Sequence, residues 1–497
     1  MFKRSSGVLA HVTSLPSPHG VGTMGKTARD FVDFLAAAHQ TYWQVLPLGH
    51  TGFGDSPYQC FSAAAGNPYL IDMDLLVEDG LLTADEVRQG DFDASPDTAD
   101  FEQLADTRWP LFRKAYSRMT PEMREEIAAF TEKNSEWLPD YALFMALKEE
   151  KYHHMPVYMW PDKDVRDRKP AALEKVTAEL RDEVDFRIFL QYIFFKQWTA
   201  LREYANEKGI QIIGDIPIYV SADSSDVWTH PKLFKLKPDR SPKLVAGVPP
   251  DYYSATGQLW GNPVYNWAAH KAENYAWWIW RMKSNMALFD VVRLDHFRGF
   301  AAYWEVGADE ETAINGKWRK GPGMELFNAI EKALGPVPLI AEDLGVQTDE
   351  VKELLEESGF PGMRVLIFGF TPDYDNEHLP HNYKPNSIVY TSTHDSQTVC
   401  EQIMDICSEP EKQFAYRYLR TLHAEAMGWS AIKCVWASSA NIAMTTLQDL
   451  LSLGADSRMN TPATIGGKNW RWRVRAEALN PTVSSMLGEI TKTYMRG

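Results

Sequence analysis

Four apolar, strand-like runs that lie far apart in this sequence each carry carboxylates at or near their ends. They are residues 210–220 with Asp215, 289–300 with Asp295, 338–345 with Glu342 and Asp343, and 387–395 with Asp395. Buried charges are costly unless they are paired, so a packed core has no use for this pattern. The carboxyl ends of parallel strands meet at one rim of an α/β sheet or barrel, where side chains reach ligands. The recurrence therefore predicts a parallel β fold with an acidic site at one rim.

Strand-like and helix-like segments alternate along most of the chain. The strand candidates are residues 7–15, 41–48, 210–220, 289–295, 338–345, 363–370, 387–393 and 443–451, and the last could also be a short helix. Amphipathic patterns predict helices between them, for instance over 27–38 and 324–333. Eight strands with intervening helices favour a closed (β/α)8 TIM barrel over an open sheet. We predict one α/β barrel over residues 1–497, with helical and loop insertions.

Two long stretches interrupt this alternation. From about residue 75 to 204 helical patterns dominate, which predicts a mostly helical insertion after the second strand. Residues 221–266, after the third strand, show few helix signals, and a loop of this length is typical of a lid or a binding loop. Ligand contacts are expected from this loop and from the Gly- and Ser-rich loop after the second strand. The candidates are Ser56, Tyr58, Tyr252, Tyr253, Trp260 and Asn262.

Composition limits the classes of partner that the protein is expected to bind. The net charge of −16, from 51 basic and 67 acidic residues, disfavours nucleic acid and anionic membranes. No run approaches the roughly 18 apolar residues of a membrane helix, and the N-terminus lacks the apolar core of a signal peptide. The four cysteines have neither metal-site spacing nor the density of a disulfide framework. We expect a cytoplasmic protein, a monomer or a weak homo-oligomer, without nucleic-acid or membrane partners.

Carboxylates that face each other across an aromatic cleft are suited to cleaving glycosidic bonds. One attacks or stabilises the reacting sugar, and another donates a proton to the leaving oxygen. Arg293 lies two residues before Asp295, so both point to the same strand face and the arginine would keep the aspartate ionised. His394, beside Asp395, could hydrogen-bond a sugar hydroxyl. Aromatic residues make up 12% of the chain, which leaves rings available for stacking on sugars.

Less specific interpretations remain open on the residues alone. Asp295 could be an ordinary strand-end carboxylate paired with Arg293, Asp215 could only support the residues that touch a ligand, and His11 and His296 could be structural. A cluster of carboxylates and histidines could also bind a divalent metal. Because no HxH, HxD or HExxH spacing supports a metal, we expect neither a metal nor a cofactor.

Several long strings carry a family resemblance. They are RSSGVLAHVTSLPSPHGVG, YWQVLPLGHTGFGDSPYQCFSAAAGNPYLID, GDIPIYVSADSSDVW, VAGVPPDYYSATGQLWGNPVYNW, VRLDHFRGF, IAEDLG and RMNTPAT. From near residue 4 to near residue 475, they resemble the amylomaltases, the 4-α-glucanotransferases or disproportionating enzymes of the α-amylase superfamily. The resemblance implies a (β/α)8 barrel without the C-terminal β-domain common in amylases.

The resemblance also implies roles for individual residues. Asp295 would be the nucleophile, Glu342 the general acid/base, and Asp395 the carboxylate that binds hydroxyls of the distorted sugar. With the residue patterns above, it assigns substrate binding or its support to Ser56, Tyr58, Asp215, Tyr252, Tyr253, Trp260, Asn262, Arg293, His296, Asp343 and His394. Ser396 stands where many relatives carry Asn, which bears on acceptor preference.

The predicted activity is transfer of a segment of an α-1,4-glucan to the 4-hydroxyl of another glucan or of glucose. A retaining double displacement would proceed through a covalent glycosyl-enzyme, with the two carboxyl groups about 5 Å apart. The expected substrates are maltooligosaccharides and the α-1,4-glucans of starch or glycogen. Two alternatives are a hydrolase of the same superfamily, which would differ in water access, and a non-catalytic α-glucan-binding protein. The presence of all three carboxylates disfavours the second.

Overall fold

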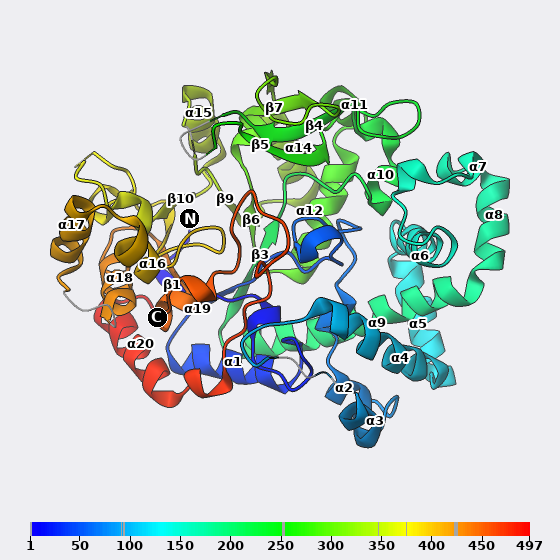
Figure 1. Ribbon diagram of the computed structural model, residues 1–497, viewed down its shortest axis with the longest axis horizontal. Helices are drawn as coiled ribbons and strands as arrows, with labels where there is room; N and C mark the ends of the chain where they lie inside the picture. The colour runs from blue at the N-terminus through cyan, green and yellow to red at the C-terminus, as the bar shows by residue number, and fades with distance from the viewer. Residues whose placement is uncertain are drawn as a thin grey trace.

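The computed structural model of the chain describes residues 2–90, 92, 95–250, 254–345, 347–373, 375–421 and 426–497 (Figure 1). At its centre, parallel strands close into a barrel in the order β1-β12-β11-β10-β9-β6-β3-β2. The strands are β1 (Ser5–Leu9), β2 (Tyr42–Gln44), β3 (Gln211–Ile216), β6 (Val291–Leu294), β9 (Leu339–Ala341), β10 (Gly362–Val365), β11 (Ser387–Tyr390) and β12 (Ile442–Thr446). The predicted (β/α)8 barrel is confirmed. Residues 443–451 contain both alternatives, because β12 runs directly into helix α19 (Leu447–Leu450).

Helices surround the barrel and bury one apolar face each. In α1, for example, the buried residues recur at helical spacing: Ala28, Phe31, Val32, Phe34 and Leu35. Helices around the barrel include α1 (Lys26–Ala37), α9 (Arg181–Glu207), α11 (Trp267–Ala272), α12 (Ala276–Leu288), α13 (Arg298–Ala301), α14 (Met324–Leu334), α15 (Asp349–Ser358), α16 (Val399–Glu401), α17 (Glu409–Leu419), α18 (Met427–Trp436) and α20 (Pro481–Thr493). Because helices cover the strands from outside and side chains fill the interior, nearly every residue of the barrel strands is buried.

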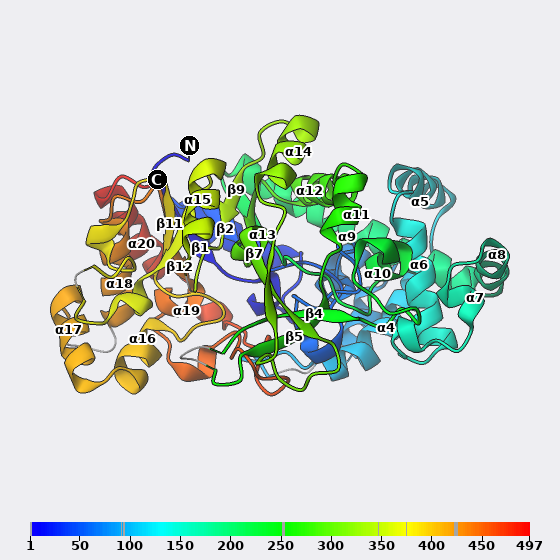
Figure 2. The same cartoon turned by 90° about the horizontal axis from the view of Figure 1, so that it is seen from above.

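A helical lobe lies between β2 and β3 and extends to one side of the barrel, in cyan and teal in Figures 1 and 2. The insertion begins with α2 (Met73–Glu78), α3 (Ala84–Gln89) and α4 (Phe101–Ser117), whose buried apolar side chains belong to the core of the barrel, and the lobe itself comprises α5 (Pro121–Lys133), α6 (Leu138–Ala146), α7 (Lys163–Arg166) and α8 (Pro170–Glu179). The lobe has a core of its own, which includes Trp137, Phe144 and Trp160. Helix α9 packs against both α6 of the lobe and β3 of the barrel, so it joins the two.

The prediction of one irregular loop over residues 221–266 was wrong in part. This range contains α10 (Ser225–Thr229), β4 (Leu244–Val248) and β5 (Gln258–Pro263). The two strands join β7 (Ala302–Gly307) and β8 (Lys317–Lys320) in an antiparallel sheet of order β5-β4-β7-β8. Pairing of β4 with β5 and with β7, which comes from a distant part of the chain, stabilises strands that are too short to be recognised by their own pattern. Among the described residues, none of the helices has the length and apolar content needed to cross a membrane.

Candidate active site

A cleft of about 1020 Å³ opens at the carboxyl ends of the barrel strands. Asp295 follows β6, Glu342 follows β9, and Asp395 lies on the loop after β11. All three carboxylates line the cleft, although they come from strands far apart in the sequence. Five further predicted residues line it as well: Ser56, Tyr58, Trp260, Asn262 and His296. The shared rim predicted from the four acidic strand ends is therefore present.

Asp295 is held by an arginine that it shares with Asp215. In the register of β3 and β6, Asp215 lies directly opposite Arg293, so both side chains point to the same side. Arg293 Nη1 lies 2.8 and 2.7 Å from the two Asp215 oxygens and 3.0 Å from Asp295 Oδ1. Burial, with the charges of Asp215 and Asp395, raises the pKa of Asp295 to about 6, although Arg293 opposes this shift. At neutral pH Asp295 is ionised and its carboxylate is available as a nucleophile.

Glu342 is fixed by backbone amides. The His296 N–H donates to Oε2 and the Leu344 N–H to Oε1, each at 2.8 Å. His296 has a φ of 50°, a left-handed conformation that non-glycine residues rarely adopt and that often marks functional sites. Burial raises the pKa of Glu342 to about 8; Arg293 opposes this shift and Asp295 adds to it. Glu342 therefore holds a proton at neutral pH that it can donate.

Asp395 belongs to a hydrogen-bonded chain of side chains. His394 Nε2 lies 3.2 Å from Asp395 Oδ2 and 2.7 Å from the Tyr58 hydroxyl. Asn460 Nδ2 donates to Asp395 Oδ1 at 2.7 Å. Burial would raise the pKa of Asp395, but the charge of His394 and these hydrogen bonds lower it to about 2. Asp395 therefore stays a carboxylate that accepts hydrogen bonds, for which sugar hydroxyls are suitable donors.

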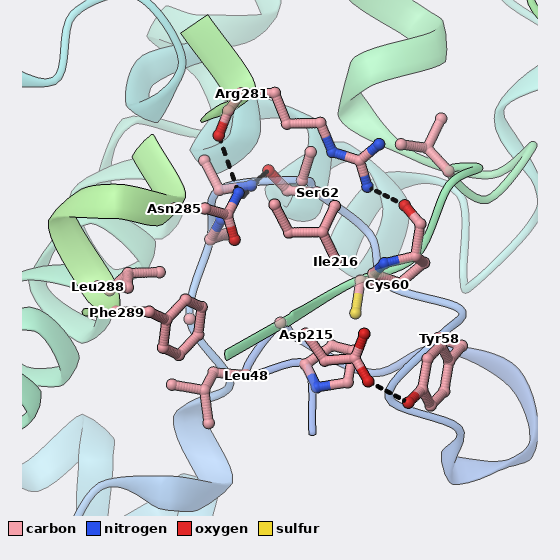
Figure 3. Close-up of a pocket in the computed structure, with 18 of the residues that line it drawn as sticks. Leu48, Tyr58, Cys60, Ser62, Asp215, Ile216, Arg281, Asn285, Leu288 and Phe289 are labelled. Atoms are coloured by element: carbon pink, nitrogen blue, oxygen red, sulfur yellow. Dashed lines mark hydrogen bonds between the residues drawn. The ribbon is translucent and has the colours of Figure 1, made fainter. Parts of the chain in front are cut away.

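Tyr58 connects Asp215, which shares Arg293 with Asp295, to His394 beside Asp395. Its hydroxyl donates to Asp215 Oδ2 at 2.8 Å, and Figure 3 shows the two groups pointing toward one another. Burial and the charge of Asp215 raise the pKa of Tyr58 well above its usual value, so the hydroxyl keeps its proton. The ring stacks on His394 with an interplanar angle of 8° and faces the cleft. One face of the ring is thus fixed by the protein, as a platform for a sugar requires.

Some predicted binding residues lie behind the cleft wall or outside the described residues. Asp215 is buried and lines a cavity of about 50 Å³ beside Cys60 and Arg281 (Figure 3). Arg293 and His394 are also buried and reach the cleft only through their partners. Asp343 does not line the cleft: its carboxylate accepts the Met363 N–H at 2.6 Å and an Arg364 hydrogen bond at 2.9 Å. Tyr252 and Tyr253 lie outside the described residues.

The Ser396 side chain points back into the loop that carries it. Its hydroxyl oxygen accepts the Thr393 N–H at 2.9 Å, and the residue is buried. Ser396 therefore acts on the shape of the loop that carries Asp395, and its side chain does not line the cleft. An influence on acceptor preference would act through that loop.

Several residues of the cleft carried no prediction of their own. Asn460, Trp470 and Gln59 line it, and Gln59 Nε2 donates to Asn262 Oδ1 at 3.0 Å. The helical lobe contributes another wall through Lys148, His154, Pro156 and Tyr158. Asn460 lies within the string RMNTPAT, so a family signal was present. Its contact with Asp395, 65 positions away in sequence, depends on the fold.

A phosphate-loop pattern is present in the sequence, because residues 20–27 read GVGTMGKT. The structure gives it another role. Residues 20–25 are buried, and a Cβ on Gly25 would lie 2.1 Å from the Asp72 carboxylate. Asp72 also accepts the Thr23 hydroxyl at 2.6 Å. A phosphate here would meet a carboxylate already in place, so this string does not form a nucleotide site.

One group of possible metal ligands lies outside the cleft lining. His19 Nδ1 is 3.9 Å from Asp72 Oδ2, and His19 Nε2 is 3.6 Å from Asp74 Oδ1. Burial and the charges of Arg108 and Arg473 lower the pKa of His19, with the two aspartates opposing. The same arginines would repel a bound cation, and the two nitrogens face different carboxylates. We therefore assign no metal to this group.

Comparisons with known proteins agree with the geometry of the cleft. Residues 10–479 match the model of the 4-alpha-glucanotransferase family. The chain is 45% identical to a 4-alpha-glucanotransferase of Clostridium butyricum, over 98% of this chain and 99% of the relative. It is 46% identical to one of Thermus thermophilus, over 99% of both chains. An amylomaltase from Streptococcus agalactiae, solved in complex with acarbose, superimposes with a TM-score of 0.97 at 44% identity, with 100% of both chains covered.

Proposed function

The chain belongs to the 4-alpha-glucanotransferase family and has the activity of that family, and we propose that its cleft performs the transfer by a retaining double displacement. The substrates are α-1,4-glucans and maltooligosaccharides. Asp295 is the nucleophile, Glu342 the general acid/base, and Asp395 the carboxylate that binds hydroxyls of the reacting sugar. Ser56, Tyr58, Trp260, Asn262 and His296 contact the sugar chain, while Asp215, Arg293 and His394 hold the contacting groups in place.

In the first step the Asp295 carboxylate attacks the anomeric carbon of the donor. The bond between that carbon and the glycosidic oxygen breaks, and Glu342 gives its proton to the departing 4-oxygen. The result is a glycosyl ester of Asp295 and a shortened glucan with a free 4-hydroxyl. Retention requires the two carboxyl groups to stand about 5 Å apart when the sugar is bound.

In the second step the Glu342 carboxylate takes the proton from the 4-hydroxyl of an incoming glucan. The oxygen attacks the anomeric carbon, and Asp295 leaves as a carboxylate, so the site returns to its starting state. A sugar must outcompete water for the glycosyl-enzyme. We infer that the cleft walls from the helical lobe and the small antiparallel sheet favour the sugar, because they exclude water around a bound acceptor.

The observation that carries this mechanism is the placement of Asp295 and Glu342 in one cleft, with Arg293 Nη1 3.0 Å from Asp295 and two backbone N–H groups donating to Glu342. The pKa of Asp295 is about 6 and that of Glu342 about 8, so around pH 7 one is ionised and the other protonated. A nucleophile and an acid need these two states at the same time. A non-catalytic glucan-binding protein would need neither.

The test follows the products formed from maltotriose. Glucose plus a series of longer maltooligosaccharides, at a constant number of reducing ends, is the expected result. Shorter products with rising reducing ends would indicate a hydrolase, which the transferase names of the relatives do not favour.

The role of Asp295 is tested with a variant. Asp295→Ala should abolish transfer and leave glucan binding largely intact, because the lost group forms the covalent bond and not the binding surface. Asp456→Ala, on an exposed side chain, is the matched control and should behave like the parent protein. Retained turnover in Asp295→Ala would remove Asp295 from the nucleophile role.

We also propose that the protein is cytoplasmic and a monomer or a weak homo-oligomer, without nucleic-acid or membrane partners. The four free cysteines and the net charge of −16 support this proposal. Sedimentation over a range of concentrations would measure the oligomeric state.

A further inference from the structure

One face of the small antiparallel sheet carries an apolar row that starts at the cleft. The register pairs Leu259 of β5 with Gly247 of β4, Gly247 with Trp304 of β7, and Trp304 with Trp318 of β8. Directly paired residues of neighbouring antiparallel strands point to the same face of a sheet. Leu259 lines the catalytic cleft, so the row extends from the cleft wall to the far edge of the sheet. Three interstrand spacings make this about 14 Å.

The tryptophan at the far edge is exposed and held in a fixed orientation. Trp318 is 41% exposed, although it is one of the largest apolar side chains. The Arg298 guanidinium carbon lies 4.2 Å from the centre of the Trp318 ring. The Trp304 ring packs edge-to-face against Trp318, with 5.2 Å between the two ring centroids. Trp304 is itself anchored, because its Nε1 donates to the Ala313 carbonyl at 2.9 Å. A ring fixed in this way loses little conformational freedom when a ligand stacks on it.

The charged side chains of β8 do not explain why an exposed tryptophan lies on this edge strand. Lys317 and Arg319 pair with Glu305 and Tyr303 and therefore lie on the opposite face from Trp318. Arg319 Nε donates to Glu305 Oε1 at 2.5 Å, so this charge is engaged on that face. Every residue of β8 is exposed. Charged residues alone would protect an edge strand from pairing with other chains, and an exposed tryptophan adds nothing to that protection.

We propose that Trp318, supported by Trp304, is a second contact for long α-glucan chains, outside the cleft. An indole face suits the apolar face of a sugar ring, and Lys320, on the same face of β8, can donate hydrogen bonds to hydroxyls. The proposal rests on the glucan substrate of the proposed function. It requires the sheet to serve two purposes, with β5 in the cleft wall and β8 about 14 Å beyond it, outside the cleft. Short substrates would be unaffected by this contact.

The first test compares a short and a long substrate. In Trp318→Ala the KM for long linear amylose should rise about three- to tenfold, the range expected for one lost stacking contact. Turnover of maltotriose should stay at the parent value. Trp318→Phe keeps an aromatic face and should recover most of the loss. Met486→Ala, on the exposed face of α20, removes an apolar side chain elsewhere and is the matched control.

The second test measures binding without turnover. In an Asp295→Ala background, Trp318→Ala should weaken the retardation of the protein by soluble amylopectin in a native gel. Unchanged amylose kinetics in Trp318→Ala together with unchanged retardation would overturn the proposal. Even then, maltotriose disproportionation by the parent protein would leave the proposed function standing. Failure of the parent protein on maltotriose would instead overturn the proposed function. A change in sedimentation without a change in glucan retardation would identify Trp318 as a contact between copies and also overturn the proposal.

Discussion

The pH dependence of transfer is the sharpest consequence of the site. Activity requires Asp295 without its proton and Glu342 with one, so the rate should rise with pH through about 6 and fall through about 8. With these two values, about four fifths of the molecules are in the active protonation state at pH 7. Only about a tenth remain in it at pH 5 or at pH 9. Ordinary carboxylates would instead place both limbs of the profile near pH 4.

The assay is kcat/KM for maltotriose between pH 4.5 and 9.5, measured after confirming that the protein stays folded over that range. The alkaline limb is assigned with Glu342→Ala and a maltosyl fluoride donor, whose leaving group departs without a proton. In that variant the alkaline limb should disappear from the glycosylation step, while the acid limb near pH 6 remains. Ala is preferred to Gln because an amide NH₂ at this position would face the N–H of His296 or Leu344.

Three results would refute this reasoning. A profile that is flat up to pH 9 would show that Glu342 is not the acid, and an alkaline limb well below pH 8 would show that its surroundings do not raise its pKa. An alkaline limb that persists in Glu342→Ala with the fluoride donor would assign that limb to another group.

Further predictions concern a positioning residue and a buried charge. Asn460→Ala removes the 2.7 Å hydrogen bond to Asp395, so kcat/KM for maltotriose should fall about ten- to hundredfold, as for other hydrogen bonds to charged groups, with little change in thermal midpoint. A clear fall in the thermal midpoint of unfolding together with the fall in kcat/KM would indicate a structural role instead. The buried Arg496 guanidinium donates to five backbone carbonyls, so Arg496→Met should destabilise the fold by about 3–5 kcal/mol. The control is Arg475→Ala, which breaks an exposed ion pair with Asp97 and should leave the thermal midpoint of unfolding nearly unchanged. Equal shifts of the midpoint in Arg496→Met and Arg475→Ala would contradict the argument from burial.

The sequence alone determined the barrel and its acidic rim. Apolar periodicity is a local property, so the eight strand candidates and most helices between them could be located without the fold. Side chains that follow a buried run must leave the core, and this places Asp295 and Glu342 at the carboxyl ends of β6 and β9. The alternation of side chains along β6 also placed Arg293 on the face of Asp295, and the two are in contact.

The tertiary structure decided which residues support these carboxylates. Tyr58 and His394 are 336 positions apart, and they stack only because the closed barrel brings the loops after β2 and β11 together. Asp343 follows Glu342 directly, yet it turns to Arg364, because successive residues of extended chain point to opposite sides. The small sheet depends on pairing between segments that have no local signal strong enough to predict it. Local patterns predict most strands and helices of the barrel, whereas the small sheet and the contacts between distant segments depend on the whole fold, which no single stretch of sequence encodes.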